Sequence, residues 1–182
     1  MNFVEELTRL DDSGDLDSAR LLLLIDAFAG SDGAGSIGGL TKLAKLDFLL
    51  RYPVMLERAL TAKKRSTRRV EVQEHERSSV ESEMVRYRFG PWDHRYRALL
   101  NALVAKGLVS VRVDGRKVTI GSTEKGRALA QQLSEDGLFE PYVRRSEILK
   151  KNFDMTATNL MRFIYDTFPE VVSLRSNKPI PT

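Results

Sequence analysis

The sequence predicts a mainly helical protein of the α+β class, in which one β-hairpin lies between two amphipathic helices. Apolar residues recur at helical spacing over residues 94–106, and a glycine follows them at position 107. Next come two stretches of strand-like alternation, residues 108–113 and 116–120, separated by Asp114-Gly115. That dipeptide favours a two-residue hairpin turn, because both residues tolerate a positive φ.

A further helix is expected directly after the hairpin. Ser122 or Thr123 can cap it, and it should continue to Leu133. Helix, two-stranded ribbon and helix in this order predict a winged-helix domain, with the ribbon as the wing. The alternative is an unrelated α+β domain that contains one hairpin.

Helical periodicity also predicts elements on both sides of this unit. We expect helices over residues 18–29, 40–52, 54–62, 140–153 and 156–168, with Asp17 or Ser18 capping the first and Thr41 the second. Residues 69–89 are predicted to be extended or irregular, and residues 89–92 to form a turn.

These elements predict a winged-helix core with additional helices at both ends. The expected divisions are an acidic N-terminal segment (1–16), the core (17–136), a C-terminal helical pair (137–170) and a flexible tail (171–182). A charged insert at about 63–83 interrupts the core. It begins with the basic cluster that includes Lys63, Lys64 and Arg65, and glutamates follow. Adjacent blocks of opposite charge are typical of a solvated, mobile segment, and the alternative is a contact with phosphate or an acidic partner.

Several classes of function lack the residues they need. The chain contains no cysteine and two histidines, which excludes thiolate chemistry and makes a zinc site held by protein side chains an unfavoured interpretation. No phosphate-loop or nucleophile-elbow motif is present. We therefore expect no cofactor, no metal and no catalytic activity. The N-terminus has no secretory signal pattern, and no apolar stretch is long enough to cross a bilayer, so a cytoplasmic protein without membrane contact is expected.

The helix before the ribbon could enter the major groove of double-stranded DNA, as the corresponding helix does in winged-helix DNA-binding proteins. The net charge of +4 is a weak indication of nucleic acid. Candidate contacts are the polar residues of that helix, the cations of the wing and the cluster in the insert: Arg95, Arg97, Asn101, Arg112, Arg116, Lys117, Lys63, Lys64 and Arg65. The alternative is that these residues are an ordinary solvated surface.

Aromatic residues and arginines gather immediately before the same helix. Tyr87, Arg88 and Trp92 have the composition of a protein-interface hot spot. The alternative is that the aromatic side chains of this stretch pack in the core.

Two motifs, Leu43-Ala44-Lys45-Leu46-Asp47-Phe48-Leu49-Leu50-Arg51-Tyr52 and Tyr87-Arg88-Phe89-Gly90-Pro91-Trp92, precede the helix–ribbon–helix unit. Together they resemble the middle components of bacterial ABC-three-component systems, including the small subunit of Lamassu antiphage systems. The resemblance covers approximately residues 18 to 170. The Gly-Pro turn is also similar to one in the antitoxin-associated family of the proteolytic adaptor SocA, which is a rival resemblance. Neither resemblance supplies catalytic residues.

The first resemblance implies a non-catalytic subunit that bridges an SMC-like ATPase and an effector such as a nuclease in defence against phage or plasmids. ATP binding and nuclease activity would then lie in partner chains of the same operon. The second hypothesis is a winged-helix transcription regulator. The two are compatible, because a subunit can also touch DNA through its basic face.

Overall fold

The computed structural model describes residues 14–78, 85–87, 90–92 and 95–170. The acidic N-terminal segment and the C-terminal tail therefore lie mostly outside the described residues. The helices are α2 (Asp15–Ala29), α3 (Leu40–Arg51), α4 (Pro53–Ala62), α5 (Glu74–Ser78), α6 (Tyr96–Ala105), α7 (Glu124–Ser134), α8 (Glu140–Phe153) and α9 (Ala157–Thr167). The strands are β1 (Val85–Tyr87), β2 (Gly90–Trp92), β3 (Val109–Asp114) and β4 (Lys117–Ser122). The protein is mainly helical with small antiparallel sheets, as expected of an α+β protein.

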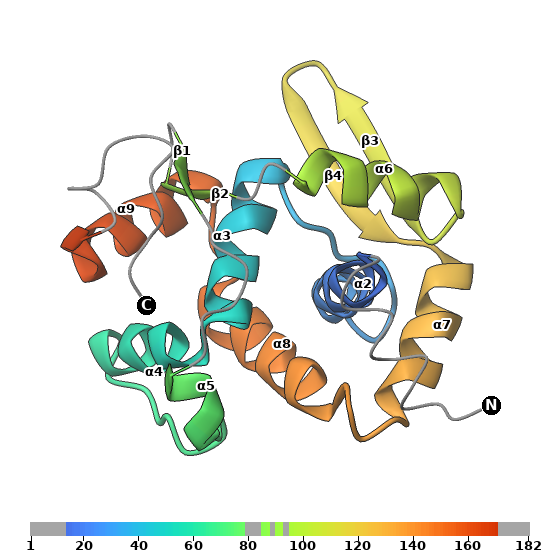
Figure 1. The fold of residues 1–182 in the computed structure, drawn as a ribbon. Coiled ribbons are helices and arrows are strands. Elements are labelled where there is room, and N and C mark those ends of the chain that lie inside the picture. The colour runs from blue at the N-terminus through green and yellow to red at the C-terminus, as the bar shows by residue number, and fades with distance from the viewer. Residues whose placement is uncertain (1–13, 79–84, 88–89, 93–94, 171–182) are drawn as a thin grey trace.

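Helix α2 is the centre of the molecule. Figure 1 shows it nearly end-on, with α6, α7 and α8 arranged around it, and all three pack against it. Its middle, residues 21–25, is an unbroken apolar run that is buried on every side. A helix that is apolar all round is one that its neighbours enclose, and the sequence follows that rule here.

Strands β3 and β4 form the expected ribbon. Their register pairs Val109 with Ser122 and Asp114 with Lys117. The two unpaired turn residues are thus Gly115 and Arg116, one position later than the predicted pair Asp114-Gly115. Gly115 has φ +58°, and Arg116 is not among the residues with positive φ, so a single glycine supplies the turn geometry.

The base of the ribbon is fastened to the helices before and after it. The Thr123 side chain caps α7 by accepting a hydrogen bond from the Gly126 amide, and it donates to the Gly107 carbonyl at the end of α6. A Cβ on Gly126 would lie 1.9 Å from the Leu108 carbonyl oxygen, so only glycine allows this close approach. A single residue, Ile37, adds an antiparallel bridge to Ile120 on the outer side of β4. The predicted sequence of helix, ribbon and helix is confirmed.

The C-terminal helices complete the same core. Helix α8 packs against α2 and α3, and α9 packs against α3 and α4. Phe168, just after α9, makes an edge-to-face contact with Phe48 of α3 at a ring distance of 5.8 Å. Buried residues from α2 to α9 form one continuous cluster.

Three local predictions were wrong. Helices α2 and α3 begin after Gly14 and Gly39, without the side-chain caps expected from Asp17, Ser18 or Thr41. Residues 74–78 form the helix α5, not irregular chain. Residues 90–92, expected in a turn, pair as β2 with β1. Gly14 and Gly39, both with positive φ, set the starts of the first two helices. Glu76 of α5 is bonded to Arg145, and β2 packs against α3, so long-range contacts add to the local signal at these two elements. In the part of the chain that the structure describes, no helix is both long and apolar enough to cross a membrane.

Candidate functional site

Helix α6 is fixed in place by a buried polar network as well as by its apolar side. The Tyr96 hydroxyl donates a short hydrogen bond to the carboxylate of Asp47 on α3. The Arg20 guanidinium of α2 also holds that carboxylate, with Nε 2.7 Å from Oδ1. Burial raises the pKa of Tyr96 well above 10, and the Asp47 carboxylate adds to this effect. The tyrosine therefore remains a hydrogen-bond donor throughout the neutral range, and the orientation of α6 is set.

The outward face of α6 is small and weakly polar. Leu99, Leu100 and Leu103 face the core, while the exposed positions are Arg97, Ala98, Asn101, Ala102, Val104 and Ala105. Val104 is 40% exposed. A solvated helix face normally carries several charges, whereas Arg97 is the one charged residue within Tyr96–Ala105. Partner side chains could pack closely against such a surface.

The ribbon adds two different faces beside α6. Antiparallel partners point to the same side of a sheet, so Val111, Val113 and Val118 continue the side on which Ile120 is buried. Val111 and Val113 are 38% and 69% exposed. Arg112 and Lys117 lie on the opposite side, with Arg116 at the turn, and all three are exposed.

Only part of the predicted nucleic-acid set lies together. Arg97, Asn101, Arg112, Arg116 and Lys117 are exposed on α6 and the ribbon. Arg95 precedes α6 as expected, but its guanidinium forms an ion pair with Asp17 at 2.8 Å. Its charge is therefore partly neutralised within the protein.

The basic cluster of the insert is remote from these residues. It follows α4, which lies on the opposite side of Figure 1 from the ribbon. The Lys63 ammonium donates to the Asn152 carbonyl at 2.5 Å and lies over the rings of Phe153 and Phe163 at 5.1 and 5.9 Å. Lys64 and Arg65 are exposed. Lys63 thus serves to hold the insert against α8 and α9.

The predicted protein-interface residues are described only in part. The backbones of Tyr87 and Trp92 belong to β1 and β2, where Tyr87 pairs with Gly90 and Val85 pairs with Trp92. Their side chains, and the whole of Arg88, lie outside the described residues. The hot-spot interpretation of these three residues stays a prediction.

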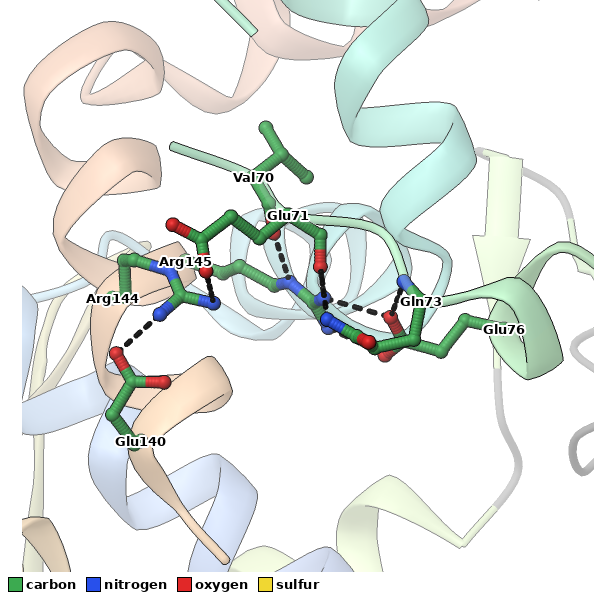
Figure 2. Close-up of polar contacts among 7 residues, drawn as sticks. All are labelled: Val70, Glu71, Gln73, Glu76, Glu140, Arg144 and Arg145. Atoms are coloured by element: carbon green, nitrogen blue, oxygen red, sulfur yellow. Dashed lines mark hydrogen bonds and ion pairs between the residues drawn. The ribbon is translucent and has the colours of Figure 1, made fainter. Parts of the chain in front are cut away.

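Sequence reasoning missed a buried arginine, Arg145, that is bonded to residues 70–76 through four hydrogen bonds. Figure 2 shows Arg145 of α8 reaching into the loop before α5. It donates to the carbonyls of Val70 and Glu71, each at 3.0 Å, and to both carboxylate oxygens of Glu76 at 2.7 and 2.8 Å. Residues 70–76 are therefore held by a buried arginine, which differs from the mobile segment expected there. The available signal was a charged residue at helical spacing from the buried Ile148 and Leu149.

The carboxylates of Glu76 and Asp154, whose pKa values are lowered, are bonded to cations of neighbouring elements. Burial works against the charged form of Glu76 and of Asp154, but the hydrogen bonds from Arg145 and from Lys150 and Lys42 prevail and hold each pKa below its ordinary value. Among the residues with described placement, no group of three His, Asp or Glu side chains could hold a metal ion. Each of these carboxylates serves to join two elements.

Comparison with known proteins adds no relative: no family model, no curated protein and no solved structure matches this chain. The exposed face of α6 and the ribbon beside it form the candidate functional site. We refer to the exposed residues of α6 together with β3 and β4 as the α6–ribbon surface.

Proposed function

We propose that the chain is a non-catalytic winged-helix subunit of a multiprotein complex, and that it binds its partner through the α6–ribbon surface. Following the resemblance of its motifs, the partners proposed are an SMC-like ATPase and an effector of an antiphage or anti-plasmid defence system. The observation that carries the proposal is the outward face of α6, where Ala98, Ala102 and Ala105 are exposed beside Val104. Cores of protein interfaces are poor in charge, as this face is.

The winged-helix assignment is supported by the order and pairing of the elements. A helix (α2), one bridging residue (Ile37), a second helix (α3), a third helix (α6) and the ribbon follow one another along the chain. Ile37 bonds to Ile120 in both directions, at 2.8 and 2.9 Å, and so adds a third strand position beside β4. Helices α2 and α6 pack against each other, and the Asp47 side chain of α3 bonds to Arg20 of α2 and Tyr96 of α6.

Co-expression with the products of the adjacent genes tests this proposal. We expect a complex that survives size-exclusion chromatography and that buries on the order of 1,000 Å² or more. Ala102→Glu, which places a charge in the middle of the α6 face, should abolish it. Ala128→Glu is the matched control, because Ala128 is also an exposed alanine, on α7. A chain that stays a lone monomer beside its neighbours, or a complex that tolerates Ala102→Glu, would overturn the proposal.

The second candidate is a winged-helix DNA-binding regulator. It is favoured by the exposure of Arg97, Asn101, Arg112, Arg116 and Lys117 around one helix and one ribbon. Phosphate contacts would give an affinity that falls steeply with salt, and Arg97 and Asn101 can read base edges. Arg97→Ala should then weaken binding to duplex DNA without unfolding the domain. Arg95→Ala is a poorer test, because it also breaks the ion pair with Asp17. Absence of binding at low salt removes this candidate.

A further inference from the structure

The outer edge of β3 is an open strand edge. The two bonds between Ile37 and Ile120 show that the N–H and C=O groups of Ile120 point away from β3. In an antiparallel ladder the residue opposite such a position also points its groups outward. That residue is Val111. Val113 lies two positions later on the same strand, so its backbone groups point to the same side. Their N–H and C=O groups therefore face away from β4.

Nothing among the described residues pairs with this edge. The sheet consists of β3 and β4, with Ile37 on the far side of β4. The side chains of Val111 and Val113 are among the most exposed large apolar residues that the structure describes. β3 has six residues with neither proline nor bulge, and the side chains of its last four residues are exposed. Such a strand is suited to accept another strand along its open edge.

The charges beside this edge indicate which kind of strand would bind there. Arg112 lies on the face opposite the valines, next to Lys117, and Arg116 follows at the turn. Asp114 is the one acidic residue of β3 and β4. A strand added beside Arg112 would bring a side chain within cross-strand distance of the guanidinium, where opposite charges stabilise and like charges destabilise. A second copy of this ribbon would bring a surplus of positive charge, so a different, acidic partner fits better.

We propose that β3 binds an extended segment of a partner protein in which apolar and acidic residues alternate, adding it to the sheet as a strand beside Val111 and Val113. Apolar side chains of the segment lie next to the two valines, and its carboxylates lie next to Arg112. This inference deepens the proposed function, on which it rests, by naming the kind of segment that the partner supplies.

A synthetic peptide of alternating valine and glutamate, blocked at both ends, is the probe. At saturation we expect amide hydrogen exchange to slow by about threefold or more at Val111 and Val113, the two outward amides, with little change at Arg112 and Asp114, whose amides already face β4. The same peptide with lysine in place of glutamate, or with alternate amides N-methylated, should bind at least about tenfold more weakly.

Two proline variants form a matched pair. Val113 and Val118 are opposite each other, and each points its N–H outward, but from different strands. Val113→Pro should weaken peptide binding by about tenfold, since it removes an outward donor at the β3 edge, while Val118→Pro should leave it unchanged. Slow exchange at the Arg112 amide in both variants reports that the ribbon is intact.

The other occupants give distinct results, each of which overturns the inference. Protection of Val111 and Val113 that grows with protein concentration, without peptide, would indicate a second copy. Equal binding of the glutamate and lysine peptides, no binding of either, or protection of this edge by duplex DNA alone would each contradict an acidic strand. A complex with the adjacent gene products that Ala102→Glu breaks and Val113→Pro does not would leave the proposed function standing while this inference falls.

Discussion

Arg20 and Asp47 meet in the centre of the molecule, with the guanidinium Nε 2.7 Å and Nη2 3.2 Å from the two carboxylate oxygens. Asp47 has no exposed surface, and it also accepts from Tyr96. Burial works against the charge of Arg20, but Asp47, with a smaller contribution from Asp17, outweighs it and keeps the pKa of the guanidinium above its ordinary value. Three helices, α2, α3 and α6, are thereby joined at one carboxylate.

Asp47→Ala should be strongly destabilising. It removes the two-oxygen partner of the buried Arg20 guanidinium, which keeps Asp17 at 2.5 Å, and it removes the acceptor of the Tyr96 hydroxyl. We expect a loss of about 3–5 kcal/mol in the free energy of unfolding. Urea unfolding measures the loss. The double variant Arg20→Met with Asp47→Leu should recover part of it, because an apolar pair needs no counter-charge, while the loss of the Asp47 acceptor for Tyr96 persists. If the losses of the two single variants simply add in the double variant, Arg20 and Asp47 do not stabilise the fold as a pair.

Lys45 makes stability depend on pH in the alkaline range. It is 1% exposed, and burial lowers the pKa of its ammonium to about 8. The folded state therefore opposes protonation of Lys45. This lowers the free energy of unfolding by about 3 kcal/mol below pH 8, and the loss disappears as the pH rises to the unfolded pKa of about 10.5.

Lys45→Met should raise the free energy of unfolding at pH 7 and remove the rise between pH 8 and 10.5. Lys42→Met is the control, since the Lys42 ammonium is paired with Asp154 at 2.9 Å and its removal should destabilise. Denaturant unfolding at several pH values measures both. A wild-type stability that is flat or falls relative to the Lys45→Met variant across that window would contradict the assignment.

Arg145→Met should release residues 70–76. Two backbone carbonyls and the Glu76 carboxylate would lose their donor (Figure 2), and each unmade buried bond costs about 1–3 kcal/mol. Faster amide exchange and early proteolytic cleavage near Val70 are the expected readouts. Acid should act in the same direction: the pKa of Glu76 is held below its ordinary value, so its contribution is lost as the pH falls through that lowered pKa.

The neighbouring Arg144 provides the control for this variant. It bonds Glu140 and Glu71, whose side chains are more than half exposed, so Arg144→Met should cost about 1 kcal/mol or less. Equal effects of the two substitutions would mean that the Arg145 contacts do not hold the segment.

The parts of the fold that could be predicted are those with a strong local signal. Thr123 caps α7, and the hairpin joins the expected strands, because this cap and this turn are each decided by a few neighbouring residues. The long-range contacts had no such signal. Arg145 meets Val70 across 75 positions, and Arg20 meets Asp47 across 27, so periodicity marks the charged residue in an apolar stripe without naming its partner.

In the candidate site, too, long-range contacts are the part that the sequence did not predict. Exposure of Arg97, Asn101, Arg112, Arg116 and Lys117 agrees with expectation, whereas Arg95 and Lys63 are engaged by residues distant in sequence. The free edge of β3 could not be predicted, because it depends on which side of β4 Ile37 occupies.

The most direct test of the account is photo-crosslinking from the α6 face in the complex with the adjacent gene products. A photoreactive amino acid at position 102 should crosslink to the partner, and the same group at position 128 on α7 should not. Crosslinks from position 128, or from neither position in an intact complex, would contradict binding through the α6–ribbon surface.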